Sequence, residues 1–89
     1  MRNNNFNLNG MIKMIDGYLV HVRNDFNEQM TYRFKVLHDA LTLYRVAKHD
    51  ESVILVTVDG IETDDNDTDV FVGSENIRYY EKGVDYVRN

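Results

Sequence analysis

The sequence predicts an α+β fold, in which a small antiparallel sheet of about five strands packs one helix on one face. Three neighbouring stretches carry this prediction. Residues 30–36 alternate apolar and polar side chains with the period of two that is typical of a half-buried strand. From Leu37 to Lys48 the apolar spacing becomes helical. Residues 53–58 form an apolar run rich in β-branched side chains, as in a strand covered on both faces.

The ends of the predicted helix carry suitable charges. Asp39 is expected to cap its start, and Lys48 and His49 suit its end, where the helix dipole favours cations. The apolar positions of the helix and its two flanking strands should meet in one core. We expect eight residues at its centre: Leu37, Leu41, Tyr44, Phe34, Val36, Ile54, Val56 and Val58.

The segments before this unit predict a meander. Asp16-Gly17 is a dipeptide favoured in tight hairpin turns, and the stretches 11–15 and 18–23 on either side of it have strand-like composition. We therefore expect a hairpin there. A polar loop over residues 24–29 then returns the chain into the strand from Met30.

After Val58, the dipeptide Asp59-Gly60 predicts another turn. Residues 70–72 should form a short strand, and 77–80 another, with 73–76 as the turn between them. A helix over 74–82, capped by Ser74, is the competing interpretation. Residues 84–87 suggest a last strand.

Length and composition limit the domain organisation. The 89 residues suit one domain over 11–89, preceded by a flexible polar arm over 1–10 that contains five asparagines. Cysteine is absent, which excludes disulfides and thiol chemistry. No apolar run is long enough to span a bilayer, and the first ten residues are too polar for a secretory signal, so we expect a cytoplasmic protein with no membrane association.

The acidic charge is concentrated in one segment. Between residues 50 and 75 there are nine carboxylates and no Lys or Arg, whereas the whole chain has a net charge of −5. The field of such a segment attracts basic protein surfaces, above all those that hold nucleic acid. The expected partner-binding residues are the carboxylates of this segment from Asp59 onward and one tyrosine beyond it that should face outward: Asp59, Glu62, Asp64, Asp65, Asp67, Asp69, Glu75 and Tyr80.

The same segment has a partial calcium-binding pattern. In an EF-hand-like register, Asp64, Asn66 and Thr68 would hold the first, third and fifth positions and Glu75 the twelfth. Asp69 stands where the sharp turn needs glycine, and neither flank is an EF-hand helix. A small metal-binding protein therefore stays an alternative without an assigned site, and no cofactor is expected.

Nucleic-acid binding is the second alternative. His21, Arg23, Arg33 and Lys35 should present cations beside tyrosines on a polar sheet face, an arrangement that can hold phosphates and stack bases. The net negative charge makes nucleic acid the less favoured partner.

The sequence does not indicate an enzyme, because it has no Gly-rich phosphate loop, no HExxH and no GxSxG. We expect a non-enzymatic binding protein that inhibits or modulates a basic, nucleic-acid-handling protein. Small size, one acidic segment and an Asn- and Tyr-rich composition give it a resemblance in style to phage-encoded inhibitors of host or defence proteins, such as anti-CRISPR proteins; this resemblance transfers no residue. Open sheet edges also favour a homodimer.

Overall fold

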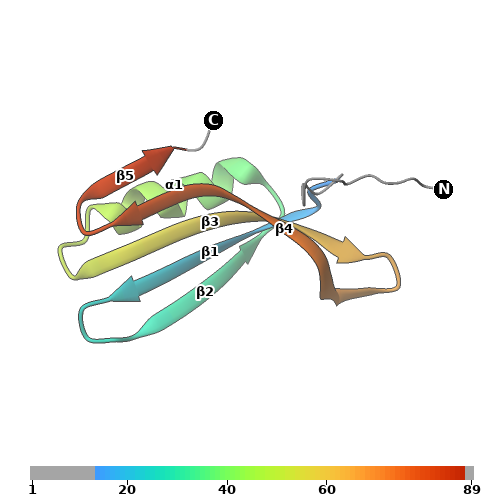
Figure 1. Ribbon diagram of the computed structural model, residues 1–89, viewed down its shortest axis with the longest axis horizontal. Coiled ribbons are helices and arrows are strands. Elements are labelled where there is room, and N and C mark those ends of the chain that lie inside the picture. Colours follow the sequence, from blue (N-terminus) through green and yellow to red (C-terminus); the bar gives the residue numbers. More distant parts are fainter. Residues whose placement is uncertain (1–13, 88–89) are drawn as a thin grey trace.

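The structure is a computed structural model that describes residues 14–87. Five strands and one helix follow in the order β1 (Gly17–Asn24), β2 (Gln29–Phe34), α1 (Leu37–Lys48), β3 (Val53–Asp64), β4 (Asp67–Glu81) and β5 (Val84–Val87). The strands form one antiparallel sheet in the order β2-β1-β3-β4-β5, and α1 lies along one of its faces (Figure 1). The predicted α+β fold is confirmed, whereas the predicted flexible arm over 1–10 lies outside the described residues.

The helix connects two strands that are not neighbours. β2 and β3 both pair with β1, so that β1 lies between them although it precedes both in the chain. In this register Val20 of β1 faces Tyr32 of β2 on one side and Val58 of β3 on the other. The two strands at the centre of the core are therefore β1 and β3.

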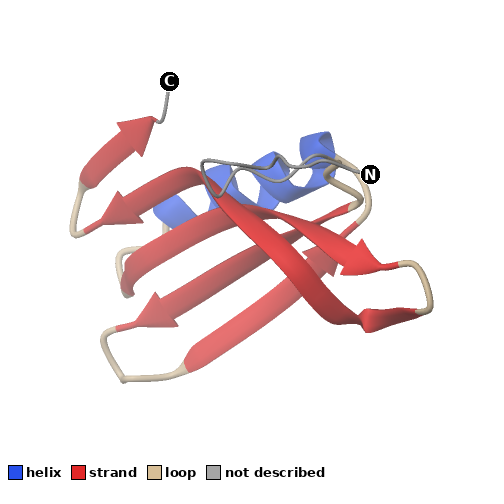
Figure 2. Ribbon diagram, turned by 45° about the vertical axis from the view of Figure 1, so that its right-hand side comes forward, coloured by secondary structure: helices blue, strands red, loops and turns tan. Residues whose placement is uncertain are grey.

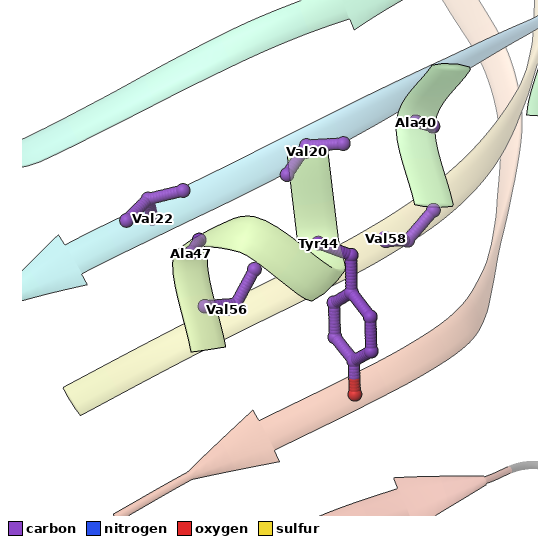
Figure 3. Packing of buried hydrophobic residues seen from close by; sticks show 7 residues of the cluster. All are labelled: Val20, Val22, Ala40, Tyr44, Ala47, Val56 and Val58. Carbon is purple, nitrogen blue, oxygen red and sulfur yellow. The ribbon is translucent and has the colours of Figure 1, made fainter. Parts of the chain in front are cut away.

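The core lies between α1 and these two strands. Ala40, Tyr44 and Ala47 recur at helical spacing on the buried face of α1. They pack against valines of β1 and β3 that are at most 6% exposed, namely Val20, Val22, Val56 and Val58 (Figure 3). The two alanines let the helix approach the sheet closely.

Three members of the predicted core lie at its centre, namely Tyr44, Val56 and Val58. Phe34, Leu37 and Leu41 pack at its margin, and Ile54 is half-buried. Val36 is wrong as a core residue, because it is 53% exposed at the start of the helix. The half-burial that the alternation in β2 predicts is wrong, because β2 is an edge strand on which most side chains are exposed.

The prediction that Asp39 caps the helix is wrong. The N-cap is Val36, whose backbone is extended and whose side chain makes no cap hydrogen bond. Asp39 lies in the first turn, where its charge still suits the helix dipole.

The two Asp-Gly turns are also wrong. Gly17 is the first residue of β1, and Asp16 before it accepts hydrogen bonds from the backbone N–H and the hydroxyl of Thr63, at 3.0 and 2.9 Å. Gly60 lies inside β3, where a Cβ atom would stand 2.8 Å from Cδ1 of Ile15. Glycine at this position makes room for a neighbouring side chain rather than for a turn. Residues 11–13 of the expected first strand lie outside the described part of the chain.

The predicted turn over 73–76 and the alternative helix over 74–82 are both replaced by one strand, β4, which runs through the whole stretch. A shift in the pairing with β3, between Val58 and Asp59, absorbs an extra residue of β4. The last strand is confirmed. It follows a tight turn in which Lys82 and Gly83 have positive φ values of 50° and 89°.

Candidate functional site

The ends of β3 and β4 extend beyond the rest of the sheet as a hairpin (Figure 1). The pairing of β1 with β3 ends at Gly17 and Ile61, so residues 62–73 continue with only each other as strand partners. We call residues 62–73 the acidic arm. It carries five carboxylates, namely Glu62, Asp64, Asp65, Asp67 and Asp69.

The arm bends because its two strands differ in length. Thr63 pairs with Phe71, but the next residue, Asp64, pairs with Asp67, so that β4 bulges over residues 68–70. Bulges of this kind bend and twist a ribbon, and Figure 2 shows the hairpin turning across the direction of the other strands.

Arg33 of β2 holds the bent arm in place. Its guanidinium group donates a hydrogen bond to the carbonyl oxygen of Thr68 at 3.0 Å. It also lies 5.4 Å from the centroid of the Phe71 ring, within the range of a cation–π contact. β2 and β4 lie on opposite sides of the β1–β3 pair in the sheet. The contacts of Arg33 therefore connect two strands that do not pair directly, and they give the arm a defined orientation.

The carboxylates at the tip of the arm are not neutralised. Asp64 accepts a hydrogen bond from the N–H of Asn66 at 2.7 Å, and Asp67 accepts one from the N–H of Asp69 at 3.0 Å. These bonds shape the turn and leave the negative charge in place. The ion pairs found within residues 14–87 join His38 to Asp39 and Lys48 to Asp85, and neither includes the arm.

The EF-hand interpretation is wrong for this segment. Its first position, Asp64, ends β3, whereas Thr68 and Glu75 lie along β4, so the backbone is a hairpin and not a calcium loop. No three His, Asp or Glu side chains of residues 14–87 are arranged so that they could hold a metal ion.

Apolar side chains adjoin the acidic tip. Val70, Phe71 and Val72 are 46, 45 and 56% exposed, although a Val-Phe-Val run in a strand usually indicates burial. The sequence predicted the strand but not this exposure, because the exposure follows from the extension of the arm beyond the body of the sheet. Contiguous exposed apolar residues with a charged rim are typical of interaction surfaces.

The remaining predicted partner-binding residues lie elsewhere. Glu75 pairs opposite Gly60 in the body of the sheet, and Asp59 is half-buried and accepts a hydrogen bond from the side-chain amide of Asn76 at 2.9 Å. Tyr80 packs against the core, so the tyrosine that faces outward is Tyr79 and not Tyr80.

The sheet face opposite α1 has no helix over it within residues 14–87 (Figure 2). Side chains alternate along each strand, and the neighbours of the buried valines point to this side. We call it the open face. Its central and β5 residues are Leu19, His21, Arg23, Leu55, Thr57, Tyr79, Glu81, Val84 and Tyr86.

Three of the four predicted basic residues, His21, Arg23 and Arg33, lie on the open face, since Arg33 of β2 pairs with Leu19 of β1. His21 and Arg23 lie on the open face, where the His21 ring is 2.8 Å from the hydroxyl of Thr31 and 3.1 Å from the side-chain oxygen of Gln29. Arg33 is engaged by the arm, and with Lys35 it lines a pocket of about 360 Å³ beside the carboxylate of Asp16. His21, Arg23 and Arg33 thus share the predicted sheet face, but the arm already engages the guanidinium group of Arg33.

Tyrosines and a glutamate complete the open face. The hydroxyl of Tyr79 donates a hydrogen bond to Glu81 at 2.9 Å, and this bond raises the pKa of Tyr79. The rings of Tyr79 and Tyr86 meet edge to face, with centroids 5.6 Å apart. Nearby, Nε of Arg23 is buried and has no hydrogen-bond partner among the described residues.

In comparisons with protein-family models, curated proteins and solved structures, nothing matches this chain. The helix within residues 14–87, α1, is too short and too polar to cross a lipid bilayer.

Proposed function

We propose that this protein is a non-enzymatic binding protein that uses its acidic arm to engage a basic surface of a partner protein. The observation that carries the proposal is the combination found on the arm. Unneutralised carboxylates at its tip adjoin three exposed apolar residues, Val70, Phe71 and Val72, on a hairpin that extends from the sheet. Carboxylates steer a basic partner into place, and apolar side chains supply the buried contact that gives affinity.

The fixed orientation of the arm supports the same function. Because Arg33 already holds the arm through Thr68 and Phe71, binding does not have to order a flexible loop. A partner surface that is basic because it handles nucleic acid would be covered by the arm, so that binding inhibits or modulates the partner.

Nucleic-acid binding by the chain itself receives less support. Arg33 is used inside the molecule, His21 is hydrogen-bonded to its neighbours, and the arm repels phosphate.

The test neutralises the tip with Asp64→Asn, Asp65→Asn, Asp67→Asn and Asp69→Asn together. Asparagine keeps the side-chain oxygens that shape the turn, so the fold should persist. The control removes four exposed charges outside the arm by Asp25→Asn, Glu28→Gln, Asp39→Asn and Glu51→Gln.

Tagged wild-type protein and both variants are used to capture proteins from a nuclease-treated lysate, and each captured protein is then purified and titrated by calorimetry. We expect a basic protein whose affinity is lost in the arm variant, kept in the control and weakened by salt. A partner that binds the arm variant as tightly as wild type, or capture of nucleic acid alone from a parallel lysate without nuclease, would overturn the proposal.

A further inference from the structure

The open face carries two opposite charges that do not meet within one chain. In the sheet register Arg23 of β1 lies opposite Leu55 of β3, which in turn lies opposite Glu81 of β4. Two strand spacings, about 10 Å, therefore separate the backbones of Arg23 and Glu81. No ion pair joins them, and Nε of Arg23 is without a hydrogen-bond partner among the described residues.

The same rows carry apolar groups that face solvent. Tyr86 and Val84 of β5 are 54 and 50% exposed, and Leu55 and Tyr79 are half-buried without a helix above them. The face is five strands wide and, along β1, eight residues long. It thus covers roughly 600 Å² in projection, somewhat below the area that one partner contributes to a standard interface, and the arm covers its β2 corner at Arg33.

From this arrangement we propose that the open face binds a second copy of this chain, in a symmetric dimer whose two-fold axis runs parallel to β3 between the two facing sheets. This proposal is independent of the function assigned to the acidic arm. Such an axis exchanges the two sides of the sheet, so that β1 of one copy lies over β4 of the other. Arg23 then stands opposite Glu81 of the second copy, and the contact occurs twice because the interface is isologous.

The other residues of the two rows also find suitable partners under this symmetry. Leu55 meets its own counterpart at the axis, and His21 lies opposite Tyr79. Sheets that pack face to face in this aligned way lie about 10 Å apart, a gap that apolar side chains and the long Arg and Glu side chains can fill. The rows lie where β3 begins, at the opposite end of that strand from the acidic arm.

A two-fold axis perpendicular to the strands would instead place Arg23 against itself and Glu81 against itself. The positions of these charges therefore select the parallel axis, and they also favour a second copy over an anionic ligand, which Glu81 would repel.

The test is a charge swap measured by sedimentation equilibrium of the full chain over a wide concentration range. Wild type should show a concentration-dependent dimer. Arg23→Glu places two carboxylates at each contact and Glu81→Arg places two cations there, so each variant alone should be monomeric. Mixed in equal amounts, the two variants should form a heterodimer, because both contacts of the mixed pair again join opposite charges.

Restoration on mixing separates loss of the contact from loss of the fold, and circular dichroism of each variant checks the fold directly. The proposal is overturned if wild type stays monomeric at the highest concentration reached. It is equally overturned if either single variant dimerises as wild type does, which would place the contact at a strand edge, or if mixing restores nothing.

Discussion

A single carboxylate connects the last strand to the helix. Asp85 of β5 accepts hydrogen bonds from the ammonium group of Lys48 and the hydroxyl of Tyr44, both on α1. The bond from Lys48, followed by that from Tyr44, holds the pKa of Asp85 below its ordinary value. Burial, with the bond to Asp85, raises the pKa of Tyr44. The short strand β5 is thus attached to the body of the protein by side chains as well as by its ladder with β4.

This contact makes the stability depend on acid. Because the pKa of Asp85 is lower in the folded than in the unfolded chain, its contribution is complete above the ordinary value of 3.8 and is lost as the pH falls through the folded value. Asp85→Asn should lower the free energy of unfolding at pH 7 by about 1 to 2 kcal/mol, since the group is partly exposed. Urea unfolding at pH 7 and pH 3 measures the difference, which should shrink at pH 3.

Asp25→Asn is the control for this comparison, because Asp25 is exposed in the β1–β2 turn. It should change the stability little at either pH. If Asp85→Asn behaved in the same way, the contact with Lys48 and Tyr44 would contribute nothing to the fold.

At the scale of the element, the start of α1 lacks a side-chain cap, so a substitution there can increase the stability. Val36 holds the N-cap position with an extended backbone, φ −120° and ψ 130°, but its side chain offers no hydrogen-bond acceptor. Val36→Ser should stabilise the protein by about 1 kcal/mol, because a serine oxygen can accept from a free N–H of the first turn. Since Val36 is 53% exposed, little apolar burial is lost.

Thermal unfolding compares Val36→Ser with Val36→Ala, which removes the same apolar groups without adding an acceptor. The serine variant should melt above wild type and the alanine variant should not. Equal melting temperatures for the two variants would show that the free N–H groups of the helix start are already satisfied by water.

The elements that the sequence predicted well are those with a strong periodic pattern. The bounds of α1 and the start of β3 follow from spacing alone, as does the last strand. The errors in the strands concern Asp-Gly pairs and a Gly-Ser pair, where local turn chemistry competed with contacts distant in the chain. Glycine is needed at position 60 because Ile15 and Ile77 pack against it, and Asp16 is held by hydrogen bonds from Thr63. These contacts are distant in the chain, so the sequence around each pair does not reveal them.

The candidate site was predictable in its charge but not in its shape. The distribution of carboxylates in the sequence locates the acidic segment. The arm itself forms because β3 and β4 continue beyond the end of β1, which only the strand register shows. The attachment of the arm through Arg33 could not be predicted either, because Arg33 and Thr68 are 35 residues apart in the sequence. The sequence alternation of β2 placed Arg33 on a solvent face without showing that the arm bends to meet it.

For the molecule as a whole, Arg33 links the arm to the sheet. Arg33→Gln should remove both the hydrogen bond to Thr68 and the contact with Phe71. Losing about 1 kcal/mol of local stability corresponds to roughly fivefold faster amide exchange in residues 67–72. Hydrogen–deuterium exchange read by NMR measures it, with Lys35→Gln as the matched loss of a neighbouring cation. Unchanged exchange in the Arg33 variant would mean that the bulged strand holds its own bend.

The place of β1 in the sheet has a consequence for synthesis on the ribosome. A nascent chain leaves the ribosome from its N-terminus, so β1, β2 and α1 emerge before β3. During that interval one edge of β1 has no partner, and Val20 and Val22 lack half of the layer that later encloses them. An unpaired edge beside exposed valines is prone to association with other chains. The hazard ends when β3 leaves the ribosome and pairs with β1.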